Sequence, residues 1–218
     1  MKPIILINFK TYQEASGEKA LEIARKIAKV NKDKYQVIIA PPLLTVKEIA
    51  EKVKLTVYAQ HVDPFSYGAH TGSILVDALK AVGVKGTLLN HSERKIPLPI
   101  LKKIVEVCKR KKIVTVVCAS SLSETKKVAQ FRPDYLAYEP PELIGGNISV
   151  TEAKPEVILK AVELVKSISS RTKVLCGAGI HSKEDIGQAL LLGTEGVLIA
   201  SAVIKSKDQK KFLEDMLL

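Results

Sequence analysis

The sequence predicts an α/β fold in which eight parallel strands alternate with helices and close into a compact (β/α)8 barrel. Eight short apolar runs recur along the 218 residues, and each is followed by a helix or a short helical segment. This alternation is typical of parallel strands joined by helical crossovers. The run 135–138 is apolar at every position, as in a strand covered on both faces. No linker or shift in composition divides the chain, so we expect one domain spanning residues 1–218.

Each strand is expected where an apolar run ends at proline, glycine or a polar residue. The expected strands are residues 3–8, 36–40, 55–60, 86–90, 113–118, 135–138, 173–177 and 196–200. The expected helices are residues 16–30, 43–52, 73–82, 97–111, 121–130, 151–169, 182–192 and 207–217. Their apolar residues recur at helical spacing, with Ser16 and Thr151 as N-caps of the first and sixth helices. Because the chain is short for such a barrel, some helices must be shortened.

An open, doubly wound sheet is the alternative to the barrel, since it also alternates strands with helices. That fold carries a glycine-rich fingerprint after its first strand when it binds a dinucleotide. Here the residues from Asn8 to Tyr12 contain no glycine. The count of eight units and the missing fingerprint both favour the closed barrel.

The composition argues against nucleic acids and membranes as binding partners of this protein. The net charge is +11, but the lysines lie at helical spacing beside apolar residues, which indicates a solvated helix surface. Aromatic residues are 5% of the chain and tryptophan is absent, so base-stacking platforms are not expected. The three cysteines form no Cys-x-x-Cys pair, which suits a reducing compartment. With no run that resembles a signal peptide or membrane span, we expect a cytoplasmic protein that binds neither nucleic acid nor membrane.

Polar residues at the ends of the predicted strands suggest a proton-transfer site. In a parallel barrel the carboxyl ends of all strands meet on one face. Asn8 and Lys10 follow the first strand, His91 and Glu93 follow the fourth, and Glu139 follows the sixth. A carboxylate there can take a proton from carbon, an imidazole can hydrogen-bond a carbonyl oxygen, and an ammonium can stabilise the developing negative charge. Glu93 is expected to orient Lys10 through an ion pair.

The loops around this rim suggest a phosphate site and a lid. The loops that contain Gly179, Ala200 and Ser201 have small side chains and precede helices, so their N–H groups can reach a phosphate. After Glu139, two prolines and then the pair Gly145–Gly146 form a rigid and a flexible joint, as in a hinged lid. Read alone, the same stretch is equally typical of a rim glutamate followed by an ordinary loop.

Four pieces of the chain together resemble the triosephosphate isomerase family, particularly its short archaeal form. They are Asn8-x-Lys10, Asn90-His-Ser-Glu93, Tyr138-Glu-Pro-Pro-Glu-Leu-Ile-Gly145 and Cys176-Gly-Ala-Gly179. Each piece is weak alone, but their order and spacing span nearly the whole chain. The resemblance implies a TIM barrel that interconverts dihydroxyacetone phosphate and glyceraldehyde 3-phosphate through an enediolate, as a step of glycolysis and gluconeogenesis. It implies no metal or organic cofactor, and a homodimer or, for the short form, a homotetramer.

The resemblance also assigns roles by position. It makes Glu139 the catalytic base, His91 a neutral electrophile, and Lys10 a catalytic and substrate-binding residue. The remaining substrate contacts are Asn8, Ile144, Gly145, Gly179, Ala200 and Ser201. The lid departs from the family pattern, because Gly145-Gly-Asn147 stands where Gly-Thr-Gly is usual. Two alternatives stay open: another phosphosugar-binding barrel enzyme, such as a phosphoribosyl isomerase, and a non-catalytic anion-binding protein.

Overall fold

The eight strands of the chain form one closed, parallel barrel. The computed structural model describes residues 2–30, 33–140 and 155–217. Its strands are β1 (Ile4–Asn8), β2 (Gln36–Ala40), β3 (Thr56–Ala59), β4 (Gly86–Leu89), β5 (Val114–Ala119), β6 (Tyr135–Tyr138), β7 (Lys173–Cys176) and β8 (Gly196–Ile199). Each strand pairs with the next in sequence, and β1 closes the barrel by pairing in parallel with both β2 and β8. The predicted (β/α)8 barrel is therefore confirmed.

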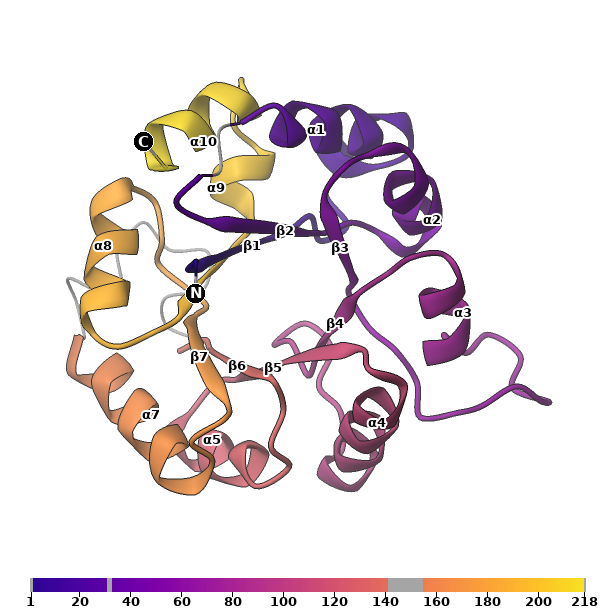
Figure 1. Ribbon diagram of the computed structural model, residues 1–218, viewed down its shortest axis with the longest axis vertical. Helices are drawn as coiled ribbons and strands as arrows, with labels where there is room; N and C mark the ends of the chain where they lie inside the picture. Colours follow the sequence, from indigo (N-terminus) through magenta and orange to yellow (C-terminus); the bar gives the residue numbers. More distant parts are fainter. Residues whose placement is uncertain (1, 31–32, 141–154, 218) are drawn as a thin grey trace.

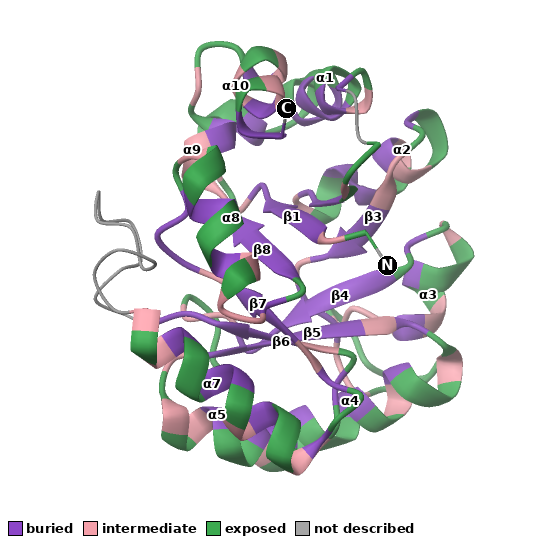
Figure 2. Ribbon diagram, turned by 60° about the vertical axis from the view of Figure 1, so that its left-hand side comes forward, coloured by how far each residue is buried: buried purple, intermediate pink, exposed green. Residues whose placement is uncertain are grey.

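The helices form a ring around the barrel (Figure 1). They are α1 (Glu18–Ala28), α2 (Leu43–Lys52), α3 (Val76–Ala81), α4 (Leu98–Lys111), α5 (Leu122–Ala129), α7 (Pro155–Ile168), α8 (Lys183–Leu191), α9 (Ser201–Ile204) and α10 (Gln209–Leu217), with a short 3-10 helix, η1 (Gln13–Ala15). Figure 2 shows buried strands inside and helices whose outer turns are exposed. No helix in the described parts of the chain is long and apolar enough to cross a membrane.

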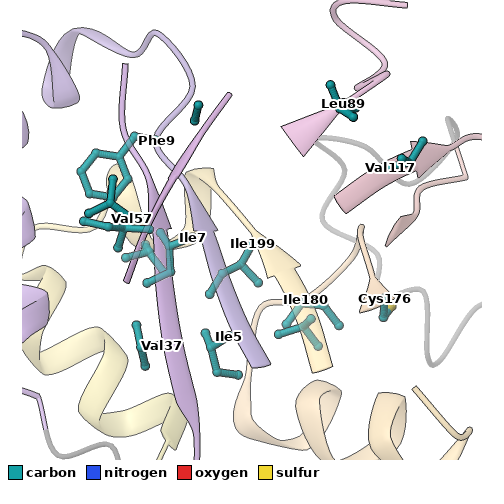
Figure 3. Packing of buried hydrophobic residues seen from close by; sticks show 14 of the residues in the cluster. Ile5, Ile7, Phe9, Val37, Val57, Leu89, Val117, Cys176, Ile180 and Ile199 are labelled. Atoms are coloured by element: carbon teal, nitrogen blue, oxygen red, sulfur yellow. The ribbon is translucent and has the colours of Figure 1, made fainter. Parts of the chain in front are cut away.

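Alternation along the strands separates two apolar layers. In β1, Ile4 and Leu6 join the cluster inside the barrel, whereas Ile5 and Ile7 pack outward against the helices. Figure 3 shows part of this outer layer, where side chains of neighbouring strands meet the helical ring. A period of two along a strand sends successive side chains to opposite faces, and here both faces are covered. That explains why these strands are continuous apolar runs.

The structure corrects several of the predicted boundaries. Ser16 is not the N-cap of α1, because Gly17 occupies that position and makes no side-chain cap. The helix expected at 73–82 shrinks to α3, since the preceding residues extend and Leu75 bridges Asp63. Two short helices, η1 and α9, were not predicted, because three or four residues are too few to show a period. The expected cap Thr151 lies outside the described residues.

Candidate active site

The structure brings the ends of β1, β4 and β6 together on the carboxyl-terminal rim of the barrel. Glu139 directly follows β6, and its backbone N–H donates to the carbonyl of Ala119 at 2.8 Å. His91 lies two residues after β4, and its Nε2 is 3.6 Å from Oε1 of Glu139. Lys10 lies two residues after β1, and its positive charge lowers the pKa of both His91 and Glu139. Three side chains that are far apart in the sequence therefore share one site, as predicted.

Glu139 is a buried carboxylate with an unusual affinity for protons. The residue is 3% exposed. Burial raises the pKa of Glu139 to about 7, although a hydrogen bond from the Cys118 thiol and the charge of Lys10 both lower it. The residue that follows the neighbouring strand β7 leaves little room for this side chain, because a Cβ on Gly177 would overlap Cγ of Glu139. Gly177 thus makes the space that the buried carboxylate occupies.

The imidazole of His91 is oriented by its own loop. Its Nδ1 accepts a hydrogen bond from the N–H of Glu93 at 3.2 Å, closer than the 3.5 Å to Oε2 of the same residue. A nitrogen that accepts a hydrogen bond carries no proton, so this bond assigns the N–H to Nε2, which faces Glu139. Burial and the charge of Lys10 also lower the pKa of His91, which favours the neutral ring. Residues 92–94 form a single turn rather than a helix, so burial and Lys10, not a helix dipole, account for this state.

Lys10 is fixed by both its backbone and its side chain. Its backbone has φ of 48°, a conformation that costs a non-glycine residue free energy. The Asn8 side chain accepts from its N–H at 2.9 Å, and the Gln60 amide donates to its carbonyl, also at 2.9 Å. Its Nζ lies 2.7 Å from Oε1 of Glu93, which confirms the predicted ion pair. Burial lowers the pKa of Lys10. The hydrogen bond to Glu93 and the negative charge of Glu93 have the larger, opposite effect, so the pKa of Lys10 is raised overall.

The small loops after β7 and β8 lie at the same rim. Gly179 is buried and has φ of 66°, a left-handed conformation that suits glycine. Ala200 is the N-cap of α9, and Ser201 is the first residue of that helix. The first N–H groups of a helix have no partner within it and can bind an anion. Ile144, Gly145 and the rest of the predicted lid from Pro141 onward lie outside the described residues.

Comparisons with known proteins identify the family of the chain. The profile of the family described as triosephosphate isomerase matches residues 3–216. The chain belongs to the triosephosphate isomerase family. It is 45% identical to the triosephosphate isomerase of Methanothermus fervidus, over 99% of this chain and 98% of that protein. It is 45% identical to that of Methanocaldococcus jannaschii, over 98% of each chain, and 41% identical to that of Methanosarcina acetivorans, over 99% and 97%.

Three supporting residues of this triosephosphate isomerase fold were not predicted from the sequence. The Gln60 amide donates a hydrogen bond to the backbone carbonyl of Lys10. The Cys118 thiol donates one to Glu139, and Gly177 leaves room for the Glu139 side chain. Gln60 had a signal, since it is a polar residue at the end of a predicted strand. Cys118 and Gly177 also end predicted strands, but their contacts with Glu139 depend on which strands lie beside β6. Among the described residues, no cluster of three or more histidine, cysteine, aspartate or glutamate side chains could hold a metal ion.

Proposed function

We propose that Glu139, His91 and Lys10 carry out the triosephosphate isomerase reaction of this chain. The single observation that carries the assignment is a buried carboxylate whose Oε1 lies 3.6 Å from the N–H face of a neutral imidazole. The chain has triosephosphate isomerase activity, as membership of the family at this identity shows. What the geometry adds is which group performs each part of that reaction.

The reaction needs a base that moves one proton between two adjacent carbons. Glu139 takes the proton from C1 of dihydroxyacetone phosphate, and the C–H electron pair moves to form the C1–C2 double bond of an enediolate. The Nε2–H of His91 hydrogen-bonds the carbonyl oxygen that receives the negative charge. His91 then gives its Nε2 proton to the C2 oxygen and takes the proton of the C1 hydroxyl, and Glu139 returns a proton to C2, which gives glyceraldehyde 3-phosphate. A carboxyl group whose pKa is about 7 can both accept and release a proton near neutral pH.

The substrate phosphate is held by backbone groups of the loops after β7 and β8, the strands that lie between β6 and β1 in the barrel. The N–H groups of Gly179, Ala200 and Ser201 fit a dianion, because their small side chains leave the backbone accessible. Ile144 and Gly145 complete this part of the proposal from the resemblance alone. Asn8 and the ammonium of Lys10 contact the substrate between its phosphate and its reacting carbons. A lid that excludes water would protect the enediolate from losing its phosphate.

Other parts of the proposal concern the whole molecule. Residues 1–218 form one domain, which works in the cytoplasm as a homodimer or homotetramer. Three observations support assembly: Leu44 is 97% exposed, Tyr67 is 70% exposed, and Phe65 is also exposed. Contiguous apolar surface is typical of an interface with another chain, so these side chains are the candidates for such a contact. All three cysteines are free and buried, which fits a reducing compartment.

An assay in heavy water tests the chemistry directly. The purified chain is given dihydroxyacetone phosphate in D2O, and the product is trapped and analysed by NMR. Proton transfer through Glu139 predicts deuterium at C2 of glyceraldehyde 3-phosphate, because the carboxyl group exchanges with solvent. Glu139→Gln should lower both turnover and labelling by several orders of magnitude while the fold is retained. Turnover of phosphoribosyl substrates alone would favour the other barrel enzymes, and salt-sensitive anion binding without turnover would favour a binding protein.

A further inference from the structure

Several hydrogen bonds around the loop after β4 converge on a carboxylate that the proposed mechanism does not use. Glu124 lies in the first turn of α5, and its Oε1 accepts from the amide of Asn90 at 2.8 Å. Its two oxygens lie 3.0 and 2.9 Å from Nζ of Lys95. Its Oε2 also accepts from the N–H and the hydroxyl of Ser120, both at 2.8 Å. One carboxylate therefore joins both ends of the β4 loop to the junction of β5 and α5.

Asn90 closes this loop on itself. It is 2% exposed and has φ of 57°, which turns the chain sharply at the end of β4. Its side-chain oxygen accepts from the N–H of Ile96 at 3.0 Å, and its amide also donates to the carbonyl of Cys118 at 2.9 Å. Residues 90–96 thus form a ring whose first and last residues are bonded to each other. The bond from Asn90 to Glu124 anchors that ring to the next strand-helix unit.

His91 is the second residue of this ring, so the ring decides where its imidazole points. The donor that fixes its Nδ1, the N–H of Glu93, belongs to the same seven-residue loop. The distance of 3.6 Å between Nε2 and Oε1 of Glu139 therefore depends on the position of the whole loop. Catalytic geometry is sensitive at this scale, because a displacement of about 1 Å can lower a rate by about 100-fold.

We infer that Glu124 is a positioning residue for the isomerase reaction, which acts by holding the His91 loop through Asn90 and Lys95. The inference rests on the roles proposed above for His91 and Glu139. Glu124 itself does not touch the reacting groups. Its task is to keep the imidazole aimed at the carbonyl oxygen while the substrate binds and leaves.

The charges around the site support this role. The pKa of Glu124 is lowered, because the N–H of Ser120 and the side chains of Lys95 and Asn90 outweigh the effect of its partial burial. Glu124 is thus ionised at neutral pH and keeps the ammonium of Lys95 in place. Lys95 in turn lowers the pKa of Glu139, which also faces Lys10, His91, Glu93 and Cys118. Charge-assisted bonds of this kind are stronger than neutral ones, so they suit a fixed anchor.

Two variants loosen the anchor in different ways. Glu124→Gln keeps the shape of the side chain but removes its charge. Asn90→Gly keeps the left-handed backbone, which glycine adopts freely, but removes the amide. We expect each to lower kcat by about 10- to 100-fold and to leave KM within about twofold, because the phosphate loops are untouched. Both substitutions act on the same anchor. The kcat of the double variant should therefore lie within about threefold of the kcat of the less active single variant.

A matched control separates positioning from stability. The Ser121 hydroxyl accepts from the N–H of Glu124 at 3.1 Å, so Ser121→Ala removes a cap of the same helix without touching the β4 loop. We expect this variant to lower Tm but to keep normal kcat. Glu48→Gln removes an exposed ion pair of 2.7 Å on α2 and should change neither activity nor the His91 loop.

The 15N signals of His91 give a readout besides activity. In the parent protein they should show one neutral tautomer with the proton on Nε2, and in Glu124→Gln a mixture of the two tautomers. A kcat within twofold of the parent for both Glu124→Gln and Asn90→Gly would overturn the inference while the proposed function stands. Loss of kcat in Ser121→Ala equal to that in Glu124→Gln would also overturn it. An inactive parent protein would instead refute the proposed function.

Discussion

The two ends of strand β6 carry carboxylates in opposite situations. Asp134 precedes the strand at the amino-terminal face of the barrel, and Glu139 follows it at the carboxyl-terminal face. Asp134 accepts from the N–H and the hydroxyl of Thr115 at 2.9 and 3.0 Å, and its own N–H donates to that hydroxyl at 3.1 Å. Glu139 is buried beside an imidazole instead, and its pKa is raised to about 7. The first arrangement stabilises a strand pair, and the second leaves a carboxylate able to react.

The presence of a cavity does not by itself mark the reactive end of the strand. A cavity of about 580 Å³ opens beside Asp134 and is bordered by Lys109, Arg132 and Arg171. It lies where the strands begin, the face on which barrels of this type carry stability rather than chemistry. The reactive end is identified by a buried carboxyl group with a shifted pKa and by neighbouring side chains that can exchange a proton with it. The active site is therefore marked by the surroundings of its carboxylate and not by the nearest cavity.

The largest expected contrast is in turnover. Glu139→Gln should lower kcat by about 10³- to 10⁴-fold, because the amide cannot accept the carbon-bound proton. Asp134→Asn should keep kcat within about twofold of the parent, since it lies at the other end of the strand. A coupled assay of both purified variants checks this. Equal losses in the two variants would remove the distinction between the ends.

The second contrast is in the pH dependence of stability. The folded protein binds the proton of Glu139 more tightly than the unfolded chain, so this group stabilises the fold fully below about pH 4.5 and progressively less toward pH 7. A shift from 4.5 to about 7 corresponds to about 3 kcal/mol. Glu139→Gln should therefore become more stable than the parent as the pH rises, by up to about 3 kcal/mol above pH 7. Urea unfolding at pH 5 and pH 8 measures it, and a constant difference would contradict the raised pKa.

The third contrast concerns the space around Glu139. In Gly177→Ala the new methyl group would overlap Cγ of Glu139 and approach the Tyr138 carbonyl to 3.0 Å. The carboxylate must shift, so kcat should fall by about 10- to 100-fold. Gly187→Ala is the matched control, because a Cβ on that residue of α8 meets no atom within 4 Å. It should keep full activity and gain about 0.5–1 kcal/mol of stability from its helical position. Normal kcat in Gly177→Ala would show that the site tolerates a displaced carboxylate.

The smallest contrast lies at the amino-terminal end. Asp134→Asn weakens a charged acceptor of two Thr115 hydrogen bonds, so the free energy of unfolding should fall by about 1 kcal/mol. Thr115→Val removes the hydroxyl partner of Asp134 and should lower the free energy of unfolding by a similar amount. The double variant should cost less than the sum of the two, because both act on the same contact. Denaturant unfolding of the four proteins tests this, and strict additivity would show that the contact contributes no stability.

Much of this molecule was predictable from local patterns. Apolar runs predicted the eight strands, and the polar residues at their ends predicted Lys10, His91, Glu93 and Glu139 as neighbours. The pattern succeeds because parallel strands place their carboxyl ends on one face, so sequence order alone assigns each end to the rim. Patterns failed for α9, which is shorter than the period needed to recognise a helix, and for the true start of α3.

Local patterns along the chain were enough to predict the order of strands and helices, the polar residues that follow the strands, and the family. The folded barrel was needed to show that Gly177 makes room for Glu139, that the Cys118 thiol donates a hydrogen bond to it and that Glu124 holds the loop of His91. These roles arise between residues that are remote in sequence, and a distance or a buried charge exists only once the barrel has closed. The raised pKa of Glu139 has the same origin, because burial is a property of the folded chain and not of the residue.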